Sequence, residues 1–230
     1  MLDGLDLTVG VGTRLLVVSE PEGSASLLLR VLAGLARPSS GTLRLAGLAR
    51  GDDSAAGWAR RVSYAGSDQA LYPWMSAREV LELALRLAGH EAEERDARME
   101  AVVNRFHLRG ELDQPFSRSG PQVAQRTLLA AALIGEPEIV LLDDPLRSLE
   151  PNERARLLHL PGKRRTLLLA SRYPASEAGL VTRVALLRHG RLALDAPIEE
   201  LERHGLPLSA RGISALADLA DTAAALAPPA

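Results

Sequence analysis

The sequence predicts an α/β fold in which a parallel sheet core carries an inserted helical block, together with a small antiparallel β portion. Two observations predict it. Short, continuous apolar runs, which are typical of strands buried in a parallel sheet, recur in both flanks of the chain. Between the flanks lies a stretch with helical periodicity and charged faces, so that the alternation of strands and helices is interrupted by helices alone.

The N-terminal flank is predicted to alternate strand and helix. An apolar run at Leu15–Val18 is followed by a short turn and by a helix over Ser26–Leu35, which should end near Gly34 because glycine favours the end of a helix. Two further strands are expected, at Thr42–Leu45 and Arg61–Ala65.

The central block is predicted to be helical. A helix is expected over Ser76–Gly89, where Ser76 and Glu79 have the spacing of a capping box. Residues 90–109 are charged with periodic apolar positions, which indicates an amphipathic helix, and a third helix is expected over Gln125–Leu133.

The C-terminal flank returns to strands, followed by a tail. Strands are expected at Ile139–Leu142, Thr166–Ala170 and Arg183–Leu187, and Arg191–Leu194 should form a hairpin with the last of these. We expect one domain over residues 1–205, with a helical subdomain at about 76–135, and a C-terminal tail at 206–230 that is partly disordered.

Composition excludes several classes of function. The 230 residues carry a net charge of −2, which gives no bulk attraction to nucleic acid, and they contain no cysteine, which excludes disulfides and thiolate metal sites. No apolar run approaches the roughly 20 residues of a membrane span, and the N-terminus lacks a basic signal region, so a cytoplasmic location is expected. The only lysine is Lys163.

The turn at residues 19–27, SEPEGSASL, has the setting of a phosphate-binding loop, since an apolar strand precedes it and a helix follows it. However, the turn holds two glutamates and no lysine.

Three stretches resemble the nucleotide-binding subunit of ATP-binding cassette (ABC) transporters. They are LLLRVLAGLARPSSGTLRLAGL (27–48), RRVSYAGSDQALYPWMSAREVLELALRL (60–87) and LIGEPEIVLLDDPLRSLEP (133–151). The resemblance implies a core like that of P-loop NTPases, ATP and Mg²⁺ as cofactors, a membrane permease and a paired ATP-binding subunit as partners, and a place at the inner face of the cell membrane. The family also carries an earlier strand and an adenine-stacking aromatic, whereas residues 1–57 contain no aromatic.

The resemblance places the family's phosphate-loop positions on Gly23, Ser24, Ala25, Ser26 and Leu27. Of the residues that carry chemistry there, Ser26 alone matches, as a ligand of Mg²⁺, whereas the lysine position holds Ala25. The loop also gains two carboxylates, and two unit charges about 4 Å apart interact by roughly 4 kcal/mol at an effective dielectric constant near 20. The substitutions predict weak or no ATP binding; alternatively, the turn only caps a helix.

Other family positions are substituted as well. Asp143 matches the aspartate that orders Mg²⁺, whereas Asp144 replaces the catalytic glutamate, Ser67 the glutamine of the Q-loop and Arg172 the switch histidine. Asp143 and Asp144 could instead be a retained strand-end pair, and Arg172 could pair with them or be a surface arginine. The signature segment keeps Ser119, Gly120 and Gln122 but has Pro121, which lacks an N–H group; this segment contacts a partner's nucleotide or is a solvated loop.

The stretch LYPWM, with Tyr72, Trp74 and Met75, lies where the family receives its permease, and aromatic residues and methionine are favoured at interfaces. Alternatively, these side chains seal the helical subdomain onto the core. The sequence therefore predicts a degenerate ATP-binding subunit of an ABC transporter, with a weak but active Mg-ATPase and a soluble, non-catalytic scaffold or regulator as alternatives.

Overall fold

The computed structural model describes residues 1–45, 47–49, 55–66, 71–144 and 165–226. The chain divides into two compact units, each described by itself below. The first unit comprises Met1–Ala36 together with Thr166–Ala230, and the second comprises Arg37–Arg165.

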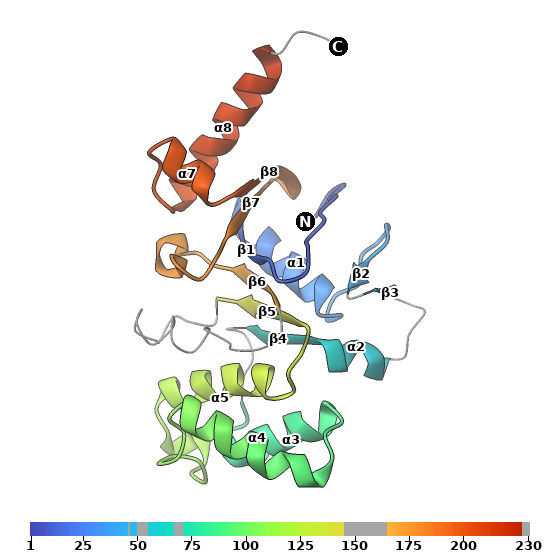
Figure 1. Ribbon diagram of the computed structural model, residues 1–230, viewed down its shortest axis with the longest axis vertical. Coiled ribbons are helices and arrows are strands. Elements are labelled where there is room, and N and C mark those ends of the chain that lie inside the picture. Colours follow the sequence, from blue (N-terminus) through green and yellow to red (C-terminus); the bar gives the residue numbers. More distant parts are fainter. Residues whose placement is uncertain (46, 50–54, 67–70, 145–164, 227–230) are drawn as a thin grey trace. The chain divides into compact units, whose positions relative to one another are not determined.

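The first unit is built on four strands, labelled in Figure 1, in the spatial order β6-β1-β7-β8. Their bounds are β1 Arg14–Glu20, β6 Thr166–Ala170, β7 Arg183–Arg188 and β8 Arg191–Pro197. β1 pairs in parallel with β6 on one side and with β7 on the other, so that Val17 lies beside both Ala170 and Ala185. β8 runs antiparallel to β7. The apolar run of β1 is therefore central and buried.

Helices complete the first unit. They are α1 Ser24–Leu32, the 3₁₀ helix η2 Pro174–Glu177, α7 Glu199–Arg203 and α8 Ala210–Leu226. α1 packs on β1 and β6 through a buried leucine-rich face, and it ends where Gly34 adopts a φ of 82°, which favours glycine. α8 packs its first half on β7 and β8 and then runs away from these strands (Figure 1).

The described residues of the second unit include two pairs of strands. β4 Val62–Gly66 and β5 Ile139–Asp143 pair in parallel, with Gly66 beside Asp143, and both end at the same edge. β2 Arg44–Leu45 and β3 Leu48–Ala49 form a short antiparallel pair, and helix α2 Ala55–Arg61 leads directly into β4.

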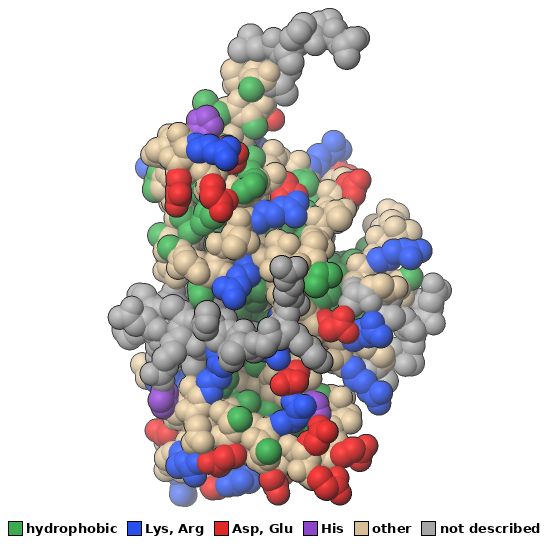
Figure 2. Space-filling view, in the orientation of Figure 1, with side chains coloured by type: hydrophobic (Ala, Val, Ile, Leu, Met, Phe, Trp, Pro, Cys, Tyr) green, Lys and Arg blue, Asp and Glu red, His purple; other side chains and the backbone are tan. Residues whose placement is uncertain are grey.

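The described part of the second unit also has three helices and a short 3₁₀ helix: α3 Ala77–Leu87, α4 Ala92–Arg105, η1 Phe116–Arg118 and α5 Pro121–Ile134. The predicted capping box is confirmed, because the Ser76 hydroxyl accepts the Glu79 N–H and the Glu79 carboxylate accepts the Ser76 N–H. α3 and α4 pack against α5 around the fully buried side chains of Leu81, Phe106 and Leu129. Figure 2 shows acidic and basic side chains interspersed over these helices.

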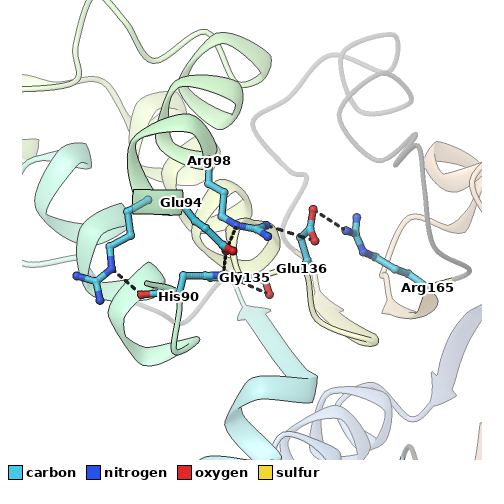
Figure 3. Close-up of polar contacts among 7 residues, drawn as sticks. His90, Glu94, Arg98, Gly135, Glu136 and Arg165 are labelled. Carbon is cyan, nitrogen blue, oxygen red and sulfur yellow. Dashed lines mark hydrogen bonds and ion pairs between the residues drawn. The ribbon is translucent and has the colours of Figure 1, made fainter. Parts of the chain in front are cut away.

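A polar network ties the start of α4 to the end of α5 (Figure 3). The two ring nitrogens of His90 lie 3.3 Å from the Glu94 carboxylate and 3.4 Å from the carbonyl oxygen of Gly135. Arg98 lies 3.5 Å from Glu94 and 3.3 Å from Glu136. The network therefore occupies the C-terminal end of α5, where unpaired helix carbonyls favour donors and positive charge.

The predicted α/β class, with a parallel core, a helical block and an antiparallel portion, is confirmed. Every predicted strand appears, within a few residues of its expected ends. The C-terminal stretch differs from the prediction: α8 covers Ala210–Leu226, because Ile213, Leu216 and Ala217 give it a buried face. No helix among the described residues combines the length and hydropathy needed to cross a membrane.

Candidate functional site

The turn between β1 and α1 holds the residues at which the resemblance places a phosphate loop. β1 ends at Glu20, and α1 begins at Ser24 after Gly23, whose φ of 105° lies in the left-handed region that glycine adopts readily. The Gly23 carbonyl oxygen accepts the Leu27 N–H at 3.0 Å, which closes the first turn of α1. The local geometry is that of a strand, a tight turn and a helix, as the sequence predicts.

The side chains of this turn provide little for a phosphate group. Ser24 is buried, and its hydroxyl donates to the carbonyl oxygen of Met1 at 3.2 Å. Ala25, in the lysine position, is buried and apolar. Ser26 and Leu27 are half-buried. The structure thus brings Gly23, Ser24, Ala25, Ser26 and Leu27 together on one turn that contains no cation.

Glu20 requires a correction to the electrostatic expectation. Its carboxylate does not stand uncompensated beside the turn: it lies 3.5 Å from Nε of Arg188 and accepts the hydroxyl of Ser214 at 3.2 Å. The register explains this, because Glu20 and Arg188 are paired residues on neighbouring parallel strands. Of the two glutamates, only Glu22 keeps the expected role of an exposed charge on the turn.

Arg188 connects β7 with α8 as well. It lies 3.0 Å from Asp218, and it donates to the Ser214 hydroxyl at 2.8 Å. The hydrogen bond to Asp218 raises the pKa of Arg188 most, and the charges of Asp218 and Glu20 raise it further. The guanidinium therefore stays charged and joins the edge of the turn to the C-terminal helix.

Arg172, at the switch position, lies just beyond β6 and is exposed. Ala170, the last residue of β6, is the register partner of Val17 on β1. The residue before Arg172 is fixed: the Ser171 hydroxyl donates to the buried Glu177 carboxylate at 3.1 Å and accepts the Tyr173 N–H at 3.1 Å.

Asp143 and Asp144 lie at the end of β5 in the second unit, and both are buried. The hydroxyl of Tyr64, on the neighbouring strand β4, donates to Oδ2 of Asp143 at 3.1 Å. Asp144 adopts a φ of 50°, a left-handed conformation that is uncommon outside glycine and is found most often at asparagine and aspartate. A pairing of Arg172 with these carboxylates stays a prediction.

The signature residues lie at the start of α5. The Ser119 hydroxyl donates to the Pro115 carbonyl oxygen at 3.3 Å, and Gly120 is the N-cap of the helix. Pro121 occupies the first helical position, where proline is well tolerated because the N–H there has no partner within the helix. Gln122 is exposed.

Tyr72 and Trp74 form an exposed aromatic pair. Their rings are stacked, with centroids 4.8 Å apart, and the two residues are 60% and 71% exposed. Met75 beside them is half-buried. Docking to a permease and sealing of the helical subdomain onto the core both stay predictions for this stretch.

Backbone bonds hold this aromatic loop to the segment that leads to the signature. The carbonyl oxygen of Met75 accepts the Phe116 N–H, and that of Pro73 accepts the Ser117 N–H, each at 2.9 Å. Ser76 also forms an isolated β-bridge with Pro115. The aromatic pair is therefore presented on a fixed backbone.

Reasoning from the sequence did not identify two residues of the site, Tyr64 and Arg188. Tyr64 lies in a predicted strand, and only the pairing of that strand with β5 brings its hydroxyl to Asp143. Arg188 is one of many arginines, and its role depends on the position of α8. Ser67, at the Q-loop position, and Lys163 lie outside the described residues.

The oxygen donors of Asp143 and Ser26 are of the kind that Mg²⁺ prefers. The set is sparse, however. Across the described ranges, no group of three or more histidine, aspartate or glutamate side chains is placed to hold a metal ion, and one oxygen of Asp143 already accepts the Tyr64 hydroxyl.

The parallel core, with its turn between β1 and α1, places the domain in the class of P-loop NTPase folds. Residues 2–147 match the family described as ABC transporter. An aliphatic sulfonates import ATP-binding protein, SsuB 1 of Mesorhizobium japonicum, is 33% identical over 215 residues, which cover 89% of this chain and 77% of that protein. The chain therefore belongs to the ATP-binding subunit family of ABC transporters.

Solved structures share the fold. The structure of an ATP-binding subunit of an ABC transporter matches with a TM-score of 0.77 at 20% identity, over 89% of this chain and 86% of that one. A dimeric ATP-binding cassette in a post-hydrolysis state, bound to ADP and Pi, matches with a TM-score of 0.74 at 20% identity, over 86% and 90% of the two chains.

Proposed function

We propose that this chain is a degenerate ATP-binding subunit of an ABC transporter, with weak or no ATP binding and hydrolysis of its own. The observation that carries the proposal is the turn between β1 and α1. Its lysine position is the buried Ala25, and the Ser24 hydroxyl is bonded to the Met1 carbonyl oxygen. The turn therefore offers a polyphosphate the N-terminal end of a helix and no side-chain cation, and a helix end alone attracts anions weakly.

The remaining role in this proposal is mechanical. The chain couples to a membrane permease through the Tyr72, Trp74 and Met75 region at the inner face of the cell membrane, and it pairs with an intact ATP-binding subunit. The exposed, stacked ring pair supports this, because aromatic anchors dominate the energetics of many protein interfaces. The relationship to an import ATP-binding protein also supports a role in transport.

Titration calorimetry of the purified chain with Mg-ATP tests the proposal. We expect no heat of binding at micromolar chain and nucleotide concentrations, and a turnover no greater than that of a buffer blank. A micromolar Kd together with Mg²⁺-dependent turnover would overturn it. An intact ATP-binding subunit of the same family, purified and titrated in the same way, shows that the assay detects binding.

A weak but active Mg-ATPase is the second candidate, and one observation favours it: two adjacent buried carboxylates, Asp143 and Asp144, remain at the end of β5. In that function Ser26 and Asp143 would hold Mg²⁺, Asp144 would orient the attacking water, and Arg172 would offset the phosphate charge. This candidate predicts a measurable ATP turnover that the Asp143→Ala substitution abolishes. A soluble scaffold or regulator, the third candidate, would show neither turnover nor association with membranes.

A further inference from the structure

The edge of the phosphate-loop turn is joined to the C-terminal helix through side chains of four residues. Glu20 ends β1, Arg188 ends β7, and Ser214 and Asp218 lie one turn apart on α8. Arg188 contacts the other three: Glu20 at 3.5 Å, Ser214 at 2.8 Å and Asp218 at 3.0 Å. Ser214 also donates to Glu20 at 3.2 Å, which closes the network.

The backbone reinforces this junction. The His189 N–H donates to the Glu20 carbonyl oxygen at 2.7 Å, so the position of the β7–β8 turn is fixed relative to the end of β1. Arg188 and Glu20 are only partly exposed, at 28% and 37% of their side-chain surfaces. Partial burial makes the attraction between these two charges stronger than in a fully exposed ion pair, and weaker than in an ion pair that is fully buried.

The junction determines where the charge of Glu20 points. The Glu20 carboxylate and the Arg188 guanidinium have all of these hydrogen-bond and ion-pair partners only while α8 supplies Ser214 and Asp218. If α8 moved away, Arg188 would lose two of its three partners, and Glu20 would lose one of its two. The side-chain geometry at the start of the turn then depends on the position of α8, and by thermodynamic linkage the reverse also holds.

We infer that Arg188 is a positioning residue that couples the turn at residues 21–23, through Glu20 at the end of β1, to helix α8, so that the order of the turn and the position of α8 depend on each other. Residues 219–223, in the second half of α8, are exposed, so a force on that half is transmitted to the turn through Asp218 and Arg188. This inference goes beyond the proposed function, since it concerns the conformation of the turn whether or not a nucleotide binds there.

Hydrogen–deuterium exchange of the full-length chain tests the coupling, because the amides that are followed lie far in sequence from the residues that are substituted. Asp218→Asn and Ser214→Ala, alone and combined, are expected to raise exchange of the Leu27 and His189 amides. For the combined variant we expect roughly three- to tenfold, because the Asp218 side chain is 64% exposed and solvent weakens its pairing with Arg188. Glu20→Gln is expected to raise exchange of the Ile213 amide, in the first turn of α8, by a similar factor.

Asp221→Asn is the matched control, because it makes the same charge change on the exposed surface of the same helix, one turn beyond Asp218. Arg188→Lys keeps the charge but lacks the planar fork, and it should behave like Asp218→Asn. Unchanged exchange, within twofold, at Leu27 and His189 in the combined variant would overturn the coupling. An equal rise in exchange at Leu27 and His189 in Asp221→Asn would also overturn it. So would a Glu20→Gln variant in which exchange of the Ile213 amide is unchanged. Circular dichroism checks that each variant is folded.

Discussion

Replacing Trp74 by alanine should separate partner binding from folding. Trp74 is 71% exposed, so its truncation removes little buried area from the chain itself. What is lost within the chain is mainly the stack with Tyr72, and an aromatic pair contributes about 0.5–1.5 kcal/mol beyond its area burial. The free energy of unfolding should therefore fall by about 1 kcal/mol, a shift in Tm of about 2–4 °C for a chain of this size.

The expected effect on membrane association is larger. If the ring pair inserts into a pocket of a membrane subunit, the exposed area of Trp74 becomes buried. Truncating a central tryptophan anchor costs about 2 kcal/mol or more. At about 1.4 kcal/mol per tenfold change, the Kd should rise roughly 30-fold. The two effects thus differ enough to be measured separately.

The measurement uses washed membranes from the organism that carries the gene, and the tagged full-length chain is titrated onto them. Bound and free chain are separated by sedimentation, and thermal unfolding of each variant is followed in parallel. Tyr173→Ala is the matched control, because Tyr173 is an aromatic residue with a similar exposure of 58% outside the docking region. Liposomes of the extracted lipids, which contain no protein, should bind neither the wild type nor the variants.

Three outcomes contradict the docking role. The first is a folded Trp74→Ala chain that binds membranes as tightly as the wild type. The second is an equal loss in Tyr173→Ala, which would indicate a nonspecific effect of removing an aromatic side chain. The third is wild-type binding to protein-free liposomes with the same affinity, which would assign the aromatic pair to lipid and not to a permease.

Asp143→Ala should leave ATP turnover at the low background of the wild type, measured by phosphate release; a turnover that disappears would favour the weak ATPase. Ser76→Ala removes the capping bond to the Glu79 N–H and should cost about 1 kcal/mol in chemical denaturation, whereas Ser76→Asp should keep most of the stability. The hydrogen bond from Arg78 lowers the pKa of Asp113 below its ordinary value of 3.8. This pair therefore stabilises the fold fully above that value, and the stabilisation is lost as the pH falls through the lowered pKa. The difference in stability between wild type and Asp113→Asn should shrink as the pH falls below the ordinary pKa of Asp113, and a constant difference would contradict it.

The elements of the fold were predictable because they depend on local patterns. Leu15–Val18 is apolar without interruption, and a strand buried on both faces needs this. Ser76 and Glu79 are three residues apart, so the capping box could be identified from spacing alone. α8 was missed because its alanine-rich end resembles a frayed tail, and its buried face depends on packing against β7 and β8.

The site was only partly predictable. The missing lysine at Ala25 is a property of the sequence, and the structure adds that this side chain is buried. The charge of Glu20 could not be assessed from the sequence, because its partner Arg188 lies 168 positions away and meets it only through the parallel pairing of β1 and β7. The Tyr64 hydroxyl reaches Asp143 through strand pairing in the same way.

The bonds between the aromatic loop and η1 make a short, stiff linkage. Pro73 and Met75 cannot be displaced relative to Ser117 and Phe116 without lengthening two backbone hydrogen bonds, each with a net value of about 0.5–1.5 kcal/mol. Ser119 follows Ser117 by two residues and α5 begins at Pro121, so a pull on the rings at Trp74 reaches the start of α5 through a short stretch of backbone. Rigidity of this kind depends on backbone hydrogen bonds, so it requires neither a lysine nor a bound nucleotide.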